Sequence, residues 1–590
     1  MLDDAFTADG NIKLEWEYML GSLRDLGAEA LHERDLKARR ILRDDGATDN
    51  LYSGDVNASR NWELDPVPYI LGSEDWARIE AGLLERSELF NLILRDIYGP
   101  RTLLHHGQLP PEALFSHSGF LRACQDIQLP GEHELIMHSA DLVRRRDGSM
   151  CVLSDRTQAP GGVGHVLENR TVMSRVFPSL FRDSHVHRIA SFYQRLRLKL
   201  FSLSLSDEAP LVVLLTPGGQ NETYFEHTAL ANYLGFSLVQ AGDLLVRNGF
   251  LWMKSMDGLK RVDVLLRWVD DVYCDPVELR SDSRLGVPGL LEVVRSGHVV
   301  VANPLGSGVL ENPIFLKYLP EISKSLLGRE PRFDSVKTYW CGDDDDLQFV
   351  IANIRTLIIK PAYRGSGLMS VWGGDLNDDQ INELIANIHN KRYHYVAQDR
   401  LEQPTIPTFT QGTLQPRPFL LRTFSIATDS SYQILPGGLT RIGIDSGSRV
   451  ISMQSGSPSK DTWVTATEPE RKVNLDPALD SIRNAMDSPL VSLPSRVVEN
   501  LYWMGRYAER SEAALRLLRT VFVLLNGEEP IGPAARKILL QTISRITATL
   551  PGFTTASDEM LAQPDDELLR IITDTSRAGS IKSTLNAMLR

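Results

Sequence analysis

The sequence predicts a multidomain protein with an α/β (α+β) body followed by an all-α C-terminal region. Three observations support this prediction: strands alternating with helices over residues 185–310, a hairpin pattern over 136–155, and a sustained three-four apolar spacing from Val497 to Leu525. Alternating strands and helices are typical of a parallel sheet, whereas three-four spacing indicates helices that pack by one face.

Length and composition set the limits of this prediction. A chain of 590 residues is longer than one hydrophobic core usually organises, so roughly two to four domains are expected. The apolar share of 42% and the charged share of 24% are ordinary for a globular protein. The formal net charge of −13 argues against a nucleic-acid partner, which would favour a basic surface.

Cysteine usage and hydropathy bear on location. The four cysteines are far apart and form no Cys-x-x-Cys pair, which is typical of a reduced protein. The first residues, MLDDAFTADG, show no basic segment followed by an apolar one, and no apolar run of about 18 residues occurs. We therefore expect a cytoplasmic protein with no membrane partner.

Residues 1–125 are expected to be mainly helical and structural. The stretch 11–43 has helical periodicity. Ser73, followed by two acidic residues, is a plausible start for a helix that continues to Ile97, before the helix-breaking Gly99–Pro100. No pattern in this region points to chemistry.

The stretch 138–170 contains the first candidate site. Alternating residues on both sides of Asp147–Gly148 predict a β-hairpin. Its pairing would bring Asp141 near Asp155. Two adjacent carboxylates are costly unless a cation or proton lies between them, so a metal site is one interpretation. Solvated acids on an exposed hairpin are the alternative.

Residues 185–310 predict a parallel α/β layer. An apolar strand at 211–217 precedes a helix from Glu222 to Leu234, and further strands lie within 237–246, 261–271 and 298–303. Parallel sheets bind ligands beyond the carboxyl ends of their strands. This placement suggests four candidate substrate contacts, namely Asn221, Glu222, Arg267 and Asp271. The alternative is that these residues lie in surface loops without a binding role.

Residues 356–399 suggest a phosphate-binding element. An apolar strand would deliver Lys360, which needs an anion if it is buried, and Gly365 and Gly367 would let backbone N–H groups approach phosphate. A helix over 379–389 would lead to a strand ending at Gln398, whose amide could pair with a base edge.

Several longer strings resemble the circularly permuted ATP-grasp type 2 family. IIKPAYRGSG followed by YVAQD resembles the nucleotide-binding half of an ATP-grasp enzyme, and the 141–161 hairpin resembles the metal-binding half, which here comes first. TPGGQNETYFEH, DPVELRSDSRLGVPGL, ILPGGLTRIG and SKDTWV are also similar to this family. The resemblance covers roughly residues 1–465. It implies an ATP-grasp core at 126–465, with a metal and acceptor half at 126–310 and a nucleotide half at 311–465.

The resemblance implies ATP-dependent carboxylate–amine ligation through an acyl phosphate, with ATP and Mg²⁺ as cofactors and a peptide or amino-acid-like substrate. It also implies roles for individual residues. The nucleotide contacts are Lys360, Arg364, Gly365, Ser366, Gly367 and Gln398. The metal ligands are Asp141 and Asp155, the catalytic cations are Arg267, Arg417 and Arg422, and the acceptor site holds Glu168, Asn169, Arg170, Asn221, Glu222 and Asp271.

The chain departs from the family's pattern at three acidic or amide positions. Where relatives read Leu-Glu-Asp-Asn, this chain has Ser154 and Arg156 in place of the Glu and the Asn, and Leu420 replaces the Asp of Asp-Leu-Arg. These changes put magnesium in doubt, and Arg156 could itself occupy the space of a metal ion as a fixed cation. The alternative function is therefore a catalytically degenerate pseudo-ligase that acts as a nucleotide- or peptide-binding scaffold.

Residues 466–492 are expected to be a linker, and 493–590 a helical domain. SRVVENLYWMGRYAERSEAALRLL resembles the start of the alpha-E domain, of which about the N-terminal third is expected here. Further helices are predicted at roughly 533–549 and 564–589. An uncovered apolar stripe on this partial domain would favour self-association or a protein partner.

Overall fold

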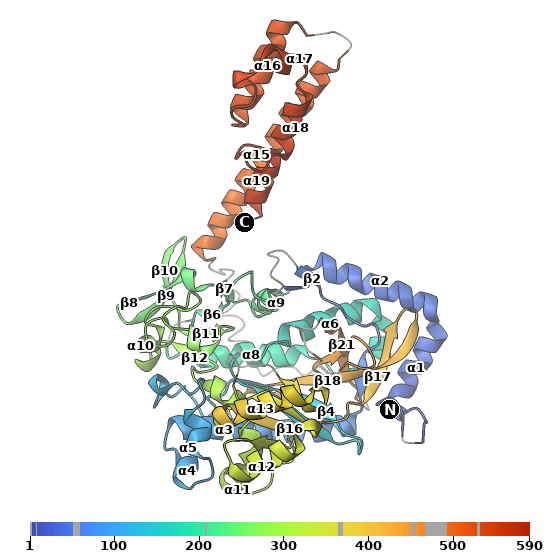
Figure 1. Ribbon diagram of the computed structural model, residues 1–590, viewed down its shortest axis with the longest axis vertical. Helices are drawn as coiled ribbons and strands as arrows, with labels where there is room; N and C mark the ends of the chain where they lie inside the picture. Colours follow the sequence, from blue (N-terminus) through green and yellow to red (C-terminus); the bar gives the residue numbers. More distant parts are fainter. Residues whose placement is uncertain are drawn as a thin grey trace. The chain divides into compact units, whose positions relative to one another are not determined.

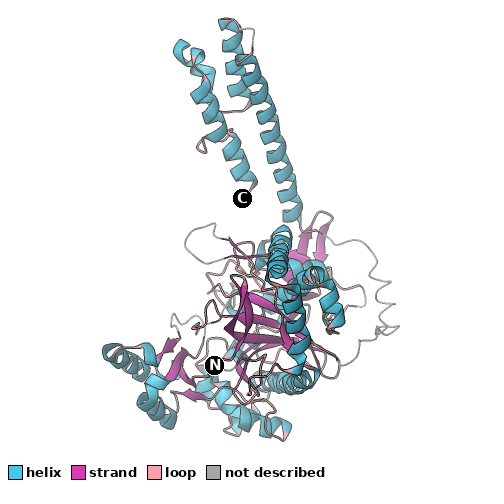
Figure 2. Ribbon diagram, turned by 90° about the vertical axis from the view of Figure 1, so that its right-hand side faces the viewer, coloured by secondary structure: helices cyan, strands magenta, loops and turns pink. Residues whose placement is uncertain are grey.

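The computed structural model describes residues 3–7, 9–50, 59–206, 209–363, 370–448, 451, 456–466, 493–527 and 531–589 (Figures 1 and 2). The chain divides into two compact units. The first contains Met1–Lys254 and Leu259–Ser492, and the second contains Ser255–Gly258 and Leu493–Arg590. Most of the predicted 466–492 linker lies outside the described residues.

The first unit begins with long helices, as predicted. The stretch 11–43, whose helical periodicity is confirmed, forms two helices. They are separated at Gly27, which adopts a φ of 81°, a left-handed conformation that glycine accepts without strain. The helix predicted to begin at Ser73 is confirmed and ends before Gly99. These three helices are α1 (Leu14–Leu26), α2 (Ala28–Asp44) and α3 (Ser73–Tyr98).

An eight-stranded sheet forms the scaffold of the first unit (Figure 2). Its main path runs β3-β21-β20-β18-β4-β5, and β17 and β19 also pair with the long central strand β18. The pairs along this path are antiparallel except β21 with β3, which are parallel. Its strands are β3 (Tyr69–Leu71), β4 (Met137–Arg144), β5 (Met150–Arg156), β17 (Thr405–Thr410), β18 (Thr413–Ala427), β19 (Tyr432–Ile434), β20 (Leu439–Ile442) and β21 (Ser459–Val464).

The predicted hairpin is confirmed as β4 and β5, but its register contains a β-bulge. Leu142 pairs with Val152, whereas the preceding Asp141 pairs with Ser154, so Leu153 is the extra residue. A one-residue bulge exchanges the faces to which the following side chains point. Ser154 and Arg156 therefore share the face of Asp141.

The two faces of this sheet carry different helices. On one face, α3 contacts the hairpin through Ser87, whose hydroxyl lies 2.9 Å from Nδ1 of His138. On the other face begins α6 (Val163–Val176), where a Cβ on Gly162 would come within about 3.1 Å of Phe424 on β18. The turn that leads into α6 thus lies on the same face as Asp141.

The predicted parallel layer is confirmed as a separate four-stranded sheet with the order β12-β11-β6-β7. All of its strand pairs are parallel. The segment 237–246 is not one strand, because a short 3-10 turn at Ala241–Asp243 divides it into β7 and β8. The layer contains β6 (Val212–Leu215), α8 (Ala190–Ser202), α9 (Tyr224–Leu234), β7 (Ser237–Val239), β11 (Val264–Arg267), α10 (Leu290–Arg295) and β12 (Val300–Ala302), beside the small antiparallel sheet β8 (Leu244–Arg247), β9 (Phe250–Ser255) and β10 (Gly258–Arg261).

A third sheet carries the predicted phosphate-binding strand. Its order is β13-β16-β14-β15, with antiparallel neighbours, and it has a core of its own around Tyr339, Ile359 and Ile388. The helix predicted at 379–389 is confirmed and starts with a capping box between Asn377 and Gln380. The elements are α11 (Phe315–Leu327), β13 (Thr338–Trp340), α12 (Asp344–Asn353), β14 (Leu357–Pro361), β15 (Val371–Trp372), α13 (Asp378–Asn390) and β16 (Tyr395–Asp399).

The second unit is all-helical from Ser495 onward. The predicted helix at 564–589 is two helices, because Ser580 caps a new one by accepting a hydrogen bond from the backbone N–H of Ser583. Leu518, Val521, Ile543 and other apolar side chains form a small core. The helices are α15 (Ser495–Leu525), α16 (Pro533–Ile546), α17 (Asp558–Ala562), α18 (Asp565–Thr573) and α19 (Ile581–Met588).

The first half of α15 leaves apolar side chains exposed. Leu501 is 53% exposed, Trp503 46% and Met504 47%. The apolar side chains that recur at three-four spacing are therefore only partly buried. Self-association or partner binding through this surface stays a prediction. Within the part of the chain that the structure describes, no helix is long and apolar enough to span a bilayer.

Candidate phosphate-binding site

Charged side chains from two sheets of the first unit lie within electrostatic range of one another. Asp141 on β4, Arg156 on β5 and Arg422 on β18 come from the eight-stranded sheet. Lys360 comes from β14 of the four-stranded antiparallel sheet and lies close enough to Arg156 and Asp141 to interact electrostatically with both. These side chains form the candidate site.

Asp141 is tied to the cations around it. Arg422 donates two hydrogen bonds to its carboxylate, Nε to Oδ1 at 2.7 Å and Nη2 to Oδ2 at 2.9 Å. The hydroxyl of Ser154 donates to Oδ2 at 2.9 Å, and Nη2 of Arg156 lies 3.9 Å from the same oxygen. Burial alone would raise the pKa of Asp141, but these guanidinium groups outweigh it and hold the pKa well below its usual range.

Arg156 lies between two carboxylates. Besides its approach to Asp141, its Nη1 is 3.5 Å from Oε2 of Glu311. Glu311 is itself fixed, because its Oε1 accepts backbone hydrogen bonds from Thr157 at 3.1 Å and Gln158 at 3.0 Å. Burial raises the pKa of Glu311, and Arg156 partly offsets that rise. Sequence reasoning missed Glu311, although an acid three residues after Gly308 was a visible signal.

Lys360 is held by the residue predicted to recognise a base. Its Nζ donates to Oε1 of Gln398 at 2.6 Å, and Nε2 of Gln398 donates to Oγ1 of Thr338 at 3.1 Å. Burial, followed by repulsion from Arg156, lowers the pKa of Lys360 to about 8. An anion bound beside Lys360 would offset both effects, because it stabilises the charged ammonium. The predicted loop residues Arg364, Gly365, Ser366 and Gly367 lie outside the described residues.

Asp155 does not share this site, so the expected pairing of Asp141 with Asp155 is wrong. The bulge at Leu153 turns Asp155 to the opposite face, where Arg86 donates to both carboxylate oxygens at 2.6 and 2.7 Å. Nε2 of His138 lies 3.0 Å from the same carboxylate. Both oxygens are buried and engaged, which contradicts the predicted role as a metal ligand.

Arg267 and Asp271 form a buried support below the site. Arg267 donates to the backbone carbonyls of Asn303 (3.0 Å), Val269 (2.9 Å) and Pro304 (3.1 Å), and it pairs with Asp271. Oδ2 of Asp271 accepts from the N–H of Gly308 at 2.8 Å. Fully buried side chains with these partners cannot touch a substrate, which contradicts the predicted catalytic role of Arg267. They hold the 307–311 segment that presents Glu311.

The predicted acceptor residues of α6 point elsewhere. Asn169 accepts from Nε1 of Trp62 at 2.9 Å, and Arg170 donates to Asp461 at 2.8 Å, so both are buried structural contacts rather than exposed substrate ligands. Glu168 faces α2, where burial and then Asp45 raise its pKa to about 7. The predicted convergence of these three residues at an acceptor site is therefore not found.

Two predicted substrate contacts precede α9, and a glutamate of α9 itself contacts the start of α6. Asn221 and Glu222 lie in the turn between β6 and α9, as predicted, and Oδ1 of Asn221 accepts from the N–H of Thr223 at 3.0 Å. Their role in substrate binding stays a prediction. Glu226, which sequence reasoning missed, accepts from the N–H groups of Gly162 at 2.6 Å and Gly164 at 3.1 Å. It therefore anchors the start of α6 beside Arg422, which donates to the carbonyl of Gly161 at 3.0 Å.

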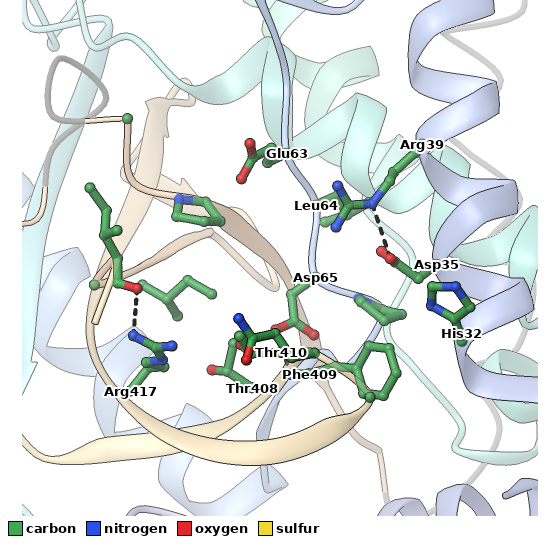
Figure 3. Close-up of a pocket in the computed structure, with 18 of the residues that line it drawn as sticks. His32, Asp35, Arg39, Glu63, Leu64, Asp65, Thr408, Phe409, Thr410 and Arg417 are labelled. Carbon is green, nitrogen blue, oxygen red and sulfur yellow. Dashed lines mark hydrogen bonds and ion pairs between the residues drawn. The ribbon is translucent and has the colours of Figure 1, made fainter. Parts of the chain in front are cut away.

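Arg417 lies in a separate cavity of about 780 Å³. Figure 3 shows it in the wall opposite Asp35 and Arg39 of α2. It donates to the backbone carbonyl of Ile444 and to Gln415. Arg417 and Arg422 are an odd number of residues apart on β18, so they point to opposite faces. Arg417 was expected to be a catalytic cation together with Arg422, but the structure does not bring the two side chains together.

The candidate site does not fit a magnesium ion in this arrangement. Magnesium in nucleotide sites is usually bound by one or two carboxylates together with phosphates. Here both oxygens of Asp141 accept from Arg422, and Oε1 of Glu311 accepts two backbone N–H groups. Among the described residues, no three Asp, Glu, His or Cys side chains are grouped so that they could hold a metal.

The fold and the family match place the chain in the ATP-grasp class. The family described as "Circularly permuted ATP-grasp type 2" matches residues 68–443, and the chain belongs to this family. Residues 493–590 match Alpha-E, described as a predicted alpha-helical domain with a conserved ER motif. Glu509–Arg510 on α15 is the Glu-Arg pair within that range.

One of two similar relatives aligns over nearly the whole chain. An uncharacterized protein of Mycobacterium tuberculosis is 36% identical over 605 residues, which is 99% of this chain and 68% of the relative. An uncharacterized protein of Synechocystis is 35% identical over 463 residues, or 78% of this chain and 96% of the relative. The structure of a glutathione synthetase-like effector from Globodera pallida has a TM-score of 0.50 at 11% identity, covering 74% of this chain and 98% of that one, which shows a shared fold.

Proposed function

We propose that the first unit binds ATP between β14 and the β4–β5–β18 face and uses it to join a carboxylate to an amine. The single observation that carries this proposal is the grouping of Arg156 and Arg422 around Asp141, with Lys360 of the second sheet within electrostatic range. Basic side chains converging from separate elements in a largely buried site are suited to a polyphosphate.

Each of the three cations has a distinct part in this proposal. Lys360 neutralises phosphate charge as a compact ammonium, whereas Arg156 and Arg422 offer planar donors that match phosphate oxygens. Asp141 acts only through Arg422, because it keeps the guanidinium of Arg422 oriented through two hydrogen bonds. Fixed donors of this kind stabilise charge that moves during phosphoryl transfer without a reorganisation cost.

The proposed reaction has two steps. A substrate carboxylate oxygen forms a bond to the γ-phosphorus of ATP while the bond from that phosphorus to the β–γ bridging oxygen breaks, which yields ADP and an acyl phosphate. The nitrogen of an amine then attacks the acyl carbon, inorganic phosphate leaves with the bonding electrons, and the amine loses a proton. We propose a peptide or an amino-acid-like molecule as the substrate, because the reaction needs a carboxylate and an amine.

A second candidate is a nucleotide- or peptide-binding scaffold without turnover. It is favoured by one specific observation, the complete engagement of the Asp141 carboxylate by Arg422 and Ser154. A site whose acid is already neutralised can retain a nucleotide without carrying out phosphoryl transfer.

Both candidates share a cytoplasmic location in our proposal. All four cysteines are buried and free, which suits a reducing compartment. ATP is also the substrate that such a compartment supplies. A fluorescent fusion that is recovered in the same cell fraction as a cytoplasmic marker would agree with this part of the proposal.

One titration series separates the candidates. ATP binding is measured by calorimetry on the full chain, and phosphate release is then measured with a mixture of peptides and amino acids. Lys360→Met should weaken ATP binding by about 10- to 100-fold, the range expected for a lost charged hydrogen bond. The matched control is Lys391→Met, an exposed lysine beyond α13.

The outcomes are distinct. Binding with amine-dependent phosphate release supports ligation, and binding without release for any substrate supports the scaffold. Failure of the wild-type chain to bind ATP, or equal binding by wild type and Lys360→Met, would contradict the proposed site.

A further inference from the structure

We infer that Arg156 supplies the fixed positive charge of the phosphate site in place of a divalent cation, so that this chain binds its nucleotide without magnesium. The inference rests on the proposed function, because it concerns the same site. It goes further by naming the resident cation and the resulting metal independence.

The backbone places Arg156 where it can take this part. Because Leu153 is the extra residue of the bulge, Arg156 pairs with Ser139 and its side chain shares the face of Asp141. Its guanidinium lies 3.9 Å from Oδ2 of Asp141 and 3.5 Å from Oε2 of Glu311. A guanidinium therefore already fills the space between the two carboxylates that could otherwise share a metal ion.

The surrounding carboxylates are matched to arginine rather than to a metal. Asp141 receives two hydrogen bonds from Arg422 in the parallel geometry that guanidinium and carboxylate groups favour. A divalent cation entering here would have to displace Arg422 or share Asp141 with Arg156. Like charges at such separations in a buried site repel strongly.

Arg156 is also held in place before any ligand arrives. Glu311, its partner, is fixed by the backbone N–H groups of Thr157 and Gln158, and the hydroxyl of Thr157 donates to the carbonyl of Ser307 at 2.8 Å. The Arg156 side chain is only 19% exposed. A cation that is pre-positioned in this way loses little conformational freedom when phosphate binds, which favours affinity.

The free donors of Arg156 distinguish it from its neighbours. Among the hydrogen bonds that the structure describes, Arg156 makes a single long one, from Nη1 to Glu311 at 3.5 Å, whereas Arg422 makes three shorter ones to Asp141 and Gly161. An arginine carries five N–H donors. Arg156 therefore retains the donor capacity that a phosphate group needs, beside Lys360.

The test measures ATP affinity by calorimetry on the full chain, in excess EDTA and in excess magnesium. The wild-type affinity should differ by less than about threefold between the two conditions. Arg156→Gln should weaken binding in EDTA by about 10- to 100-fold, and Arg156→Lys should restore part of the loss. Arg146→Gln is the matched control, because Arg146 lies in the turn of the same hairpin with its side chain 77% exposed.

A double variant supplies the converse test. Ser154→Glu combined with Arg156→Asn replaces the cation with oxygen ligands on the face of Asp141, so its ATP affinity should rise at least about tenfold when magnesium is added. Thermal melting of each variant verifies folding, and Arg156→Lys remains informative if Arg156→Gln does not fold.

Each result decides between the claims. Wild-type binding that appears only with magnesium would overturn this inference but leave the proposed ATP site intact. Binding in EDTA that Arg156→Gln does not weaken would overturn the assigned role of Arg156. Absence of ATP binding under both conditions would instead overturn the proposed function.

Discussion

The two faces of the β4–β5 hairpin carry similar residues in very different surroundings. Each face has an aspartate paired with an arginine from outside the hairpin, Asp141 with Arg422 and Asp155 with Arg86. On the first face, Arg156 and Lys360 add positive charge that the carboxylates do not fully engage. On the second face, α3 covers the pair, and Arg86 and Asp155 are buried with their charges matched. The surroundings, rather than the aspartate itself, separate a binding site from a structural ion pair.

The covered face also shows why geometry alone does not define a catalytic site. Ser87, His138 and Asp155 form a hydrogen-bonded chain, with Ser87 2.9 Å and Asp155 3.0 Å from the two ring nitrogens of His138. Serine proteases use the same three residue types. Here Ser87 is 0% exposed and His138 is 1% exposed, so no substrate can reach the hydroxyl. We assign these three hydrogen-bonded side chains a structural role, which is to connect α3 to the hairpin.

The largest expected effect concerns stability on the covered face. Arg86→Ala should lower the free energy of unfolding by about 3–5 kcal/mol, because it leaves Asp155 buried without its charge partner. Arg145→Ala, which removes an exposed pair with Asp334 from the same hairpin, should cost about 0–1 kcal/mol. Urea unfolding monitored by tryptophan fluorescence measures both, and equal losses would contradict the difference expected between a buried and an exposed ion pair.

The free energy of unfolding should depend on pH in acid solution through Asp155. Burial raises the pKa of Asp155, but Arg86 and then His138 outweigh it and lower the pKa to about 2. Since the unfolded value is about 3.9, this carboxylate contributes stability above that pH and loses it as the pH falls toward 2. In Asp155→Asn the stability should fall less steeply over this window, which acid unfolding curves can test. Parallel curves for the two proteins would rule out the assigned contribution.

On the site face, the affinity for ATP should depend on pH through Lys360. Its pKa of about 8 in the free protein should rise when phosphate binds, so binding takes up a proton in alkaline solution. Affinity should therefore stay constant below about pH 7.5 and weaken by about tenfold by pH 9. Calorimetry in buffers of different ionisation enthalpy detects the proton uptake. Lys360→Arg, which remains charged, should abolish the dependence, and an unchanged profile in this variant would assign it to another group.

The smallest effect is expected at Ser154. Its hydroxyl donates one hydrogen bond to Asp141, which Arg422 already holds in place. Ser154→Ala should therefore cost about 0.5–1.5 kcal/mol of stability and change ATP affinity by less than about threefold. A loss of affinity as large as that of Lys360→Met would show that Ser154 acts directly on the nucleotide.

The sequence was sufficient for features that depend on local patterns. The Asp-Gly turn predicted the hairpin, and the apolar run before Lys360 predicted its strand, because turn chemistry and hydrophobic periodicity act over a few neighbouring residues. The resemblance of longer strings predicted the family. The two helices that replace the segment 564–589 were missed because the capping role of Ser580 was not recognised.

The errors at the site share a physical origin in register and burial. Without the bulge, Asp155 would lie on the same face as Asp141, and alternation alone gives no sign of the extra residue Leu153. Likewise, Arg267 was predicted correctly at the end of β11, but the sequence does not reveal that backbone carbonyls engage its guanidinium. Such contacts join residues that are distant in sequence.

The most direct test of the central claim is a crystal structure of the chain with a non-hydrolysable ATP analogue, grown in EDTA. We predict terminal phosphate oxygens within hydrogen-bond distance of the Arg156 guanidinium and the Lys360 ammonium, with Arg422 still paired to Asp141. A nucleotide bound away from Arg156, or a structure in which the analogue binds only after magnesium is added and the ion lies on Asp141, would contradict the account.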